Sequence, residues 1–161
     1  MIRWFAALAA VLAAGCASMG MPDVAPGQTE AEVRKEMGNP AMELKKPGGD
    51  TFLYYTYYPG GRICNVAVIG TDGKLVRMEQ RLTAENIYGI KKGMKDQAVR
   101  ELLGPPRVIS RLPNQNLIVW EYPWIKSSSE KRILWVHYTP DDGVVFKVVE
   151  AHDEVAEPTS D

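Results

Sequence analysis

The sequence predicts an α+β protein made of two tandem units, each a helix followed by three strands, with the helices packed on one face of antiparallel sheet. Three observations support this class. A helix-forming motif that ends in glycine and proline occurs twice, at residues 27–40 and 93–106. Three strand-like segments follow each copy, and an Asp-Gly turn separates the last two segments of each set. One unit of roughly 55–70 residues is marginal for a core of its own, whereas two packed together are sufficient.

Composition and charge exclude several classes of protein. The 161 residues include 19 Lys and Arg against 20 Asp and Glu, so the net charge is −1, and 45% of the residues are hydrophobic. This balance excludes a polybasic nucleic-acid binder and gives no support for a disordered chain. Two cysteines cannot form a disulfide scaffold, and two histidines leave few options for a metal. We therefore expect no nucleic-acid partner, no metal and no other cofactor.

The first element in the chain, residues 1–15, has the pattern of a secretory signal peptide. Arg3 supplies a positive start, an apolar run follows from Trp4 to Ala14, and Gly15-Cys16 ends it. Small residues directly before a cysteine resemble the bacterial lipobox, in which the leader is cut before the cysteine and that residue is lipidated. The alternative is an ordinary signal peptide cut nearby.

The lipobox resemblance implies that Cys16 becomes the N-terminal residue and carries palmitate and other acyl chains. Each buried methylene contributes roughly 0.8 kcal/mol, so several chains anchor a protein firmly in lipid. Ala17 follows Cys16, and the absence of aspartate there implies the outer membrane rather than the inner one, with the protein facing the periplasm. Residues 16–26 are small and contain Gly and Pro, which predicts a flexible tether.

The next element is the helix that opens each unit, and its two copies share residues at the same spacing. With an offset of 66 (Gly27 to Gly93), five of fourteen positions are identical, where composition alone gives roughly one match. The shared residues are Gly27, Val33, Arg34, Gly38 and Pro40, and correspondingly Gly93, Val99, Arg100, Gly104 and Pro106. We expect each second glycine to take the left-handed conformation that ends a helix, and each proline to prevent its continuation.

The starts of the two helices differ in the side chain available for capping. Thr29 followed by Glu32 forms the pattern of a capping box. The second copy has Lys95 where the first has Thr29, so its cap is predicted to be weaker.

Strands follow each helix. The first unit, residues 27–82, has strand-like segments at 51–58, 63–69 and 74–80; the second, residues 83–152, has them at 117–125, 132–138 and 144–150. Residues 83–92 are predicted to form a further short helix. Asp72-Gly73 and Asp142-Gly143 are hairpin turns by composition. The extra residues of the second unit are placed in the polar loop at 126–130.

Period-two alternation assigns a core face and an opposite face to each unit. Positions that are apolar in both copies form the predicted core: Tyr54, Cys64, Val66, Val68, Val76 and Met78, aligned with Trp120, Leu134, Val136, Tyr138, Phe146 and Val148. The opposite face then carries Tyr55, Asn65, Ala67 and Arg77 in the first unit, and Glu121, Trp135, His137 and Lys147 in the second.

Exposed aromatic and cationic side chains recur at binding hot spots. The predicted partner-binding surface therefore contains Trp135, His137, Lys147, Glu121, Tyr55 and Arg77. The alternative is that Trp135 packs under the Ser-rich loop or under the C-terminal tail. That tail, residues 153–161, is acidic and is predicted to be frayed.

The repeated motif, followed by the aromatic strand Val119-Trp120-Glu121-Tyr122, resembles the BamE/SmpA small outer-membrane lipoprotein domain. Tandem pairs of that unit also resemble the β-lactamase inhibitory protein fold. The resemblance covers about four-fifths of the chain and implies a binding module of the outer-membrane envelope that is not an enzyme. Its best-known member is an accessory lipoprotein of the machine that inserts β-barrels, and it has one unit where this chain has two.

Three functions of different classes follow. The first is a lipid-anchored scaffold that binds another envelope protein, accessory to outer-membrane protein assembly or to envelope integrity. The second is a periplasmic inhibitor that covers an enzyme with its sheet. The third is a small hydrolase or a thiol enzyme.

Cys64 is the only thiol besides Cys16, but it alternates with Val66 and Val68, which predicts a buried, inert side chain on the face opposite His137. The sequence contains no phosphate loop, nucleophile elbow or dinucleotide fingerprint.

Overall fold

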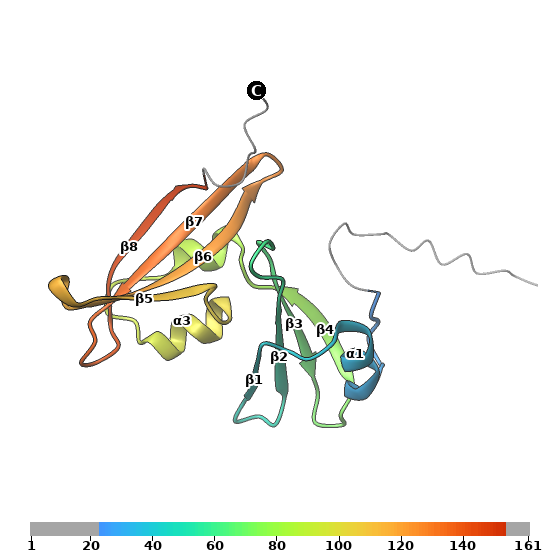
Figure 1. Ribbon diagram of the computed structural model, residues 1–161. Coiled ribbons are helices and arrows are strands. Elements are labelled where there is room, and N and C mark those ends of the chain that lie inside the picture. The colour runs from blue at the N-terminus through green and yellow to red at the C-terminus, as the bar shows by residue number, and fades with distance from the viewer. Residues whose placement is uncertain (1–22, 154–161) are drawn as a thin grey trace, which may run out of the picture.

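The structure of the protein, a computed structural model, describes residues 23–153. The predicted leader, Cys16 and residues 154–161 of the predicted tail lie outside the described residues. Within them the chain forms two four-stranded antiparallel sheets and three α-helices, so the class is α+β (Figure 1). No helix of this part of the chain is long and apolar enough to cross a bilayer.

Each sheet is a meander in chain order. The first half contains helix α1 (Glu30–Met37) and strands β1 (Met42–Lys45), β2 (Thr51–Thr56), β3 (Cys64–Ile69) and β4 (Leu75–Gln80). The second half contains helices α2 (Ala84–Gly89) and α3 (Asp96–Leu103) and strands β5 (Val108–Leu112), β6 (Leu117–Ser127), β7 (Glu130–Tyr138) and β8 (Val145–His152), with a 3-10 turn at Pro113–Gln115.

The six predicted strands and the short helix after residue 83 are present, but the prediction of three strands per unit is wrong. A fourth strand follows each helix directly: β1 pairs with β2, and β5 pairs with β6. Both are edge strands of at most five residues. Their side chains are half-buried or exposed, so they lack the long apolar alternation that identifies the inner strands.

Local chemistry sets the ends of the main helices. Thr29 and Glu32 form the predicted capping box, whereas Lys95 provides no side-chain cap to α3. Gly38 and Gly104 end α1 and α3 with φ of 79° and 87°, which confirms the positive φ that was predicted. Their ψ values are −160° and −171°, however, so the backbone is not left-handed helical. It lies in a region that only glycine occupies readily.

The layers alternate between helix and sheet. Val33 of α1 packs on one face of the first sheet, in a cluster with Leu53, Tyr55, Ala67, Ile69 and Leu75. The other face of that sheet presents Tyr54, Cys64, Val66 and Val68 to a larger cluster, which includes residues of α2, α3 and the second sheet. Figure 1 shows α3 and α1 on opposite sides of the first sheet. The prediction that helices cover only one face is therefore wrong for this sheet, and all six residues of β3 are buried.

A bulge in each sheet overturns two core assignments. The register shifts between Val68 and Ile69 against β4, and between His137 and Tyr138 against β8. Each bulge inserts one unpaired residue, and the alternation reverses there. Val76 and Phe146 are consequently 48% and 46% exposed rather than buried. Met78 pairs with Ala67, and it packs in the cluster under α1 rather than with Val66 and Val68.

Candidate interaction face of the second sheet

The second sheet has an inner face, which packs on the helices, and an outer face. Trp120, Tyr122, Leu134, Val136 and Tyr138 form the inner face and lie in one cluster with Ile87 of α2 and Val99 and Leu103 of α3. Strand register places Glu121 opposite Trp135 and His137 opposite Lys147, at alternate positions. We call outer face the surface that carries Val108, Glu121, Trp135, His137, Lys147 and Val149. Val119 and Ile133 lie on the same face but are buried, at 8% and 7% exposed. Four of the six residues predicted to bind a partner therefore lie on one surface.

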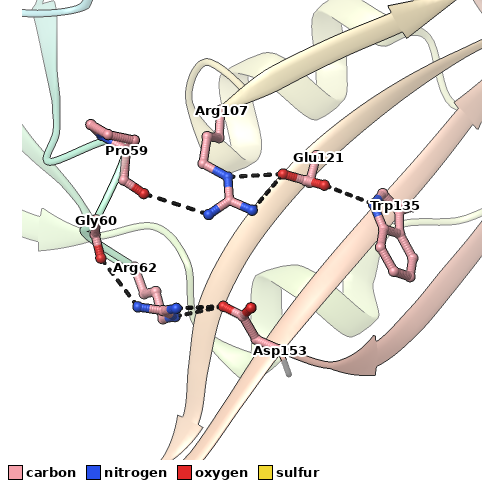
Figure 2. Close-up of polar contacts among 7 residues, drawn as sticks. All are labelled: Pro59, Gly60, Arg62, Arg107, Glu121, Trp135 and Asp153. Carbon is pink, nitrogen blue, oxygen red and sulfur yellow. Dashed lines mark hydrogen bonds and ion pairs between the residues drawn. The ribbon is translucent and has the colours of Figure 1, made fainter. Parts of the chain in front are cut away.

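A chain of hydrogen bonds holds the centre of the outer face in place (Figure 2). Arg107, directly before β5, donates from Nε and Nη2 to Oε1 of Glu121 over 2.8 and 2.6 Å. The other carboxylate oxygen, Oε2, accepts a hydrogen bond of 3.0 Å from Nε1 of Trp135. Because its only polar atom is already paired, the indole can offer a partner its apolar ring, held in one orientation.

The network also joins the two sheets. Nη1 of Arg107 points to the carbonyl oxygen of Pro59, at 3.5 Å, in the loop between β2 and β3. In the same loop, Arg62 donates to Oδ2 of Asp153 over 2.9 and 2.5 Å and to the carbonyl oxygen of Gly60 over 3.1 Å (Figure 2). The Asp153 side chain is only 1% exposed. The prediction that the tail frays from residue 153 is thus wrong for Asp153, because an ion pair with Arg62 holds it.

His137 and Lys147 form the charged end of the outer face. They are directly opposite across β7 and β8. Burial, and secondarily the neighbouring Lys147 charge, lower the pKa of the His137 imidazole. The imidazole is therefore neutral at neutral pH, and the positive charge at this end of the face belongs to Lys147, whose side chain is exposed.

Tyr55 and Arg77 lie elsewhere, and their assignment to this surface is wrong. Tyr55 is 4% exposed and packs in the α1 cluster, and burial raises the pKa of its hydroxyl. Arg77 pairs with Val68, on the other face of the first sheet, and its Nε lies 2.6 Å from Oε1 of Glu79. Asn65 and Ala67 are buried as well.

Tyr55 was assigned to the wrong face because the sequence alignment of the two halves is out of register by one residue at β2 and β6. Met42 pairs with Tyr54, and Val108 pairs with Glu121. The offset is 66 at β1 and β5 but 67 at β2 and β6, so Tyr54 corresponds to Glu121 and not to Trp120. A slip of one residue moves every side chain of a strand to the other face. Strand pairing, which the sequence alone does not show, is needed to detect it.

Cys64 and His137 do not form a catalytic dyad. The Cys64 side chain is fully buried between the first sheet and the end of α3, whereas His137 lies on the outer face of the second sheet. Burial raises the pKa of the Cys64 thiol to about 12, so it stays protonated at neutral pH. Within residues 23–153, no group of three or more His, Cys, Asp or Glu side chains is placed to hold a metal ion.

Sequence reasoning missed Arg107, Arg62 and Asp153, which position the outer face relative to the first sheet. Arg107 follows the second copy of the motif, where the first copy has Ala41. An arginine in place of alanine beside a shared proline was the one signal available. The partners of these residues come from distant parts of the chain, which no local pattern reveals.

The sequence matches no protein-family model and has no recognisable relative among curated proteins. Among solved structures, the chain is similar to a candidate β-lactamase inhibitor protein from Streptococcus mutans, at 18% identity and a TM-score of 0.36. The match covers 78% of this chain and 83% of that one. At this distance the likeness assigns no function, and membership of the BamE/SmpA family stays a prediction.

Proposed function

We propose, first, that the chain is two copies of one structural unit. Backbone hydrogen bonds recur at matched positions: Gly27 N to Leu75 O at 2.8 Å and Gly93 N to Val145 O at 2.9 Å. Glu30 N to Gly73 O and Asp96 N to Gly143 O form a second such pair. Isolated bridges join Thr29 to Lys74 and Lys95 to Val144. These contacts hold the entry of each helix against the last hairpin of its sheet. Gly27 and Gly93 have φ of 93° and 91° there, a conformation that favours glycine.

We further propose that the protein is a non-enzymatic interaction module, anchored by acylated Cys16 in the outer membrane and facing the periplasm. Its outer face would bind another protein of the envelope. The observation that carries this proposal is an asymmetry between the sheets. The first is covered on both faces, by α1 and by α3, whereas the helices that flank the second pack on its inner face. Within residues 23–153 no helix packs on the outer face, which exposes Val108 and Lys147 at its margins.

The chemistry of the outer face suits recognition better than catalysis. A tryptophan oriented by neighbouring charges provides a rigid apolar contact at low entropic cost, and exposed Lys147 and Val108 lie at its margins. The thiol-enzyme alternative would need a reactive nucleophile, and the burial of Cys64 supplies none.

A photo-crosslinking residue in place of Lys147, in the full chain expressed in its native envelope, tests this proposal. The matched control replaces Lys45, an exposed lysine of β1 on the other sheet. We expect position 147 to capture a discrete protein and position 45 to capture none. Capture of a barrel-assembly component favours the accessory role, and capture of a soluble enzyme favours the inhibitor role. Equal capture at both positions, or none at position 147, contradicts an interaction site on the outer face.

A further inference from the structure

We infer that the edge strand β5 binds an extended acidic segment of another protein, which adds to the second sheet as a further strand and places a carboxylate beside Arg100 and Arg111. This site goes beyond the proposed function, because it lies at the edge of the sheet and on the side of α3 rather than on the outer face. The arginine that the two helix motifs share points to it, because the pairing of that arginine differs between the two halves.

In the first half the shared arginine is Arg34, and it has two carboxylate partners. Its Nη2 lies 2.7 Å from Oε1 of Glu30, one turn earlier in α1, and 2.8 Å from Oε1 of Glu43. Glu43 belongs to β1, an edge strand of the first sheet. Hydrogen bonds to the two carboxylates raise the pKa of the Arg34 guanidinium. The edge strand therefore supplies an ion pair to the helix beside it.

In the second half the equivalent arginine, Arg100, has no carboxylate partner among residues 23–153. Ile109 of β5 stands at the position where β1 has Glu43. The carboxylate of Asp96, one turn earlier in α3, accepts a hydrogen bond from the next backbone N–H instead. The Arg100 guanidinium lies over the ring of Trp120, 4.6 Å from the ring centre. The second half thus keeps the arginine of the motif but lacks the acid of the edge strand.

A second arginine without a partner lies on the same face of β5. Ile109 pairs with Trp120 and Arg111 pairs with Ile118, so the Ile109 and Arg111 side chains both point to the α3 side of the sheet. Arg111 is exposed and has no hydrogen-bond or ion-pair partner in the described part of the chain. Arg100, above Trp120, and Arg111 therefore flank Ile109. A carboxylate placed beside Ile109 would lie between two guanidinium groups.

The backbone of β5 is open to a further strand. It is an edge of the second sheet, and residues 108–112 form no backbone hydrogen bond outside the ladder with β6. A guest strand binds the N–H and C=O groups that an edge strand leaves unpaired. Charged side chains discourage such pairing, and β1, β4 and β8 each carry both acidic and basic residues. In contrast, β5 has no acidic residue and exposes Val108 and Ile109, at 43% and 51%.

A hollow beside Arg111 fits an apolar side chain of the guest. Its volume is about 170 Å³, and its lining includes Arg111, Leu112, Pro113, Leu117, Ile118 and Pro140. Side chains two residues apart lie on the same face of a strand. A guest with its carboxylate beside Ile109 would therefore direct the side chain two positions away to this hollow. The ligand is thus an extended segment with an acidic residue and an apolar residue two positions from it.

The test uses a fluorescein-labelled peptide, Thr-Leu-Thr-Glu-Thr-Leu-Thr, whose symmetric pattern suits either strand direction, and a matched peptide with Gln in place of Glu. Fluorescence anisotropy measures binding to the full chain in detergent, and hydrogen exchange read by mass spectrometry locates it. We expect the Glu peptide to bind about tenfold more tightly, because charge-assisted hydrogen bonds are stronger than neutral ones. Bound peptide should slow exchange in residues 108–112.

Three variants connect this preference to the arginines. Arg111→Gln should remove most of the preference for the Glu peptide. Arg77→Gln is the matched control and should leave it unchanged, since Arg77 is an exposed arginine of edge strand β4 that already pairs with Glu79. Ile109→Glu copies the arrangement of the first half, so the new carboxylate should pair with Arg100 and abolish binding of the Glu peptide without lowering the melting temperature.

Other outcomes would overturn the inference. These are equal binding of the two peptides, no binding of either, or slowed exchange only outside residues 108–112. Protection of residues 108–112 that grows with protein concentration in the absence of peptide would assign the edge to a second copy. Protection without peptide at every concentration, lost when Glu154 and Glu157 are both replaced by Gln, would assign it to the chain's own acidic tail. The crosslinking test at position 147 is independent of these measurements, so the proposed function stands or fails separately.

Discussion

Trp135 Nε1 donates a 3.0 Å hydrogen bond to the Glu121 carboxylate, whose other oxygen accepts two hydrogen bonds from Arg107. The ring on the outer face is therefore oriented by Glu121, and Glu121 is held by Arg107, which also reaches the loop between β2 and β3 of the first sheet. Glu121 is a positioning residue for Trp135, and Arg107 is one for Glu121. This relationship separates Trp135 from the core tryptophans of the same sheet.

Truncation of Trp135 should cost much less stability than truncation of Trp124. Trp124 is fully buried and meets Tyr88 edge to face at 5.9 Å, so Trp124→Ala should lower the free energy of unfolding by about 3–5 kcal/mol. Trp135 is half-buried, and Trp135→Ala should cost only about 1–2 kcal/mol, for one hydrogen bond and part of the ring burial. Urea unfolding measures both, and partner capture should fall only for Trp135→Ala. Equal losses of stability would assign Trp135 to the core.

Gly38 and Gly104 should respond unequally to substitution, although the sequence alone assigns them the same role. Gly38→Ala strains only the backbone, which costs on the order of 1–3 kcal/mol. Gly104→Ala adds a contact of 2.5 Å with Cys64 Sγ, so its loss should be larger.

Cys64→Ala tests the source of that difference, because it removes the sulfur that the new methyl group would meet. The Gly104→Ala/Cys64→Ala double variant should be more stable than the sum of the single losses predicts. Strict additivity would show that the sulfur contact is not what separates the two glycines.

The Cys64 thiol should resist modification in the folded protein. Burial raises its pKa to about 12, so between pH 7 and 9 it is both protonated and covered. In a Cys16→Ser chain, where Cys64 is the only thiol, a bulky maleimide should label it only after denaturation, as read by mass spectrometry. Rapid labelling of the native chain would show that the end of α3 opens from the first sheet.

Protonation of His137 should lower the free energy of unfolding at acid pH. The native state lowers the pKa of its imidazole below the usual 6.5, through burial and then through Lys147. The unfolded chain therefore binds the proton more readily, and stability falls as pH drops from the unfolded pKa toward the lower native one. At pH above the unfolded value both states are neutral and the effect vanishes. Denaturant midpoints between pH 8 and 5 should show a smaller decline in His137→Gln than in the parent chain. Identical declines in the two chains would show that His137 does not cause the loss of stability at acid pH.

Cys16→Ser should release the protein from membranes. The helices of residues 23–153 are too short or too polar to span a bilayer, and the lipobox resemblance assigns anchoring to acylated Cys16. Palmitate labelling and membrane fractionation of both forms provide the measurement. A variant that is unlabelled yet still sediments with membranes would require a different anchor.

The local chemistry of the sequence was sufficient to predict the elements and many of their ends. Thr29 with Glu32 predicted the start of α1, Gly38 and Gly104 predicted the ends of α1 and α3, and the two Asp-Gly pairs predicted hairpin turns. Each of these features depends on side chains and backbone within a few residues of one another, so a single sequence contains the whole cause.

Only the tertiary structure decided which surfaces are buried. Tyr55 faces α1, Val76 and Phe146 are displaced outward by bulges, and Arg107 and Asp153 find partners in the distant loop 57–62. Each outcome depends on strand register or on contacts between residues far apart in the chain. The alternation of apolar and polar residues alone predicts that a strand has two different faces. It could not show that both faces of the first sheet are covered while the second sheet keeps an outer face with Trp135 on it, because that follows from how the helices stack between the sheets.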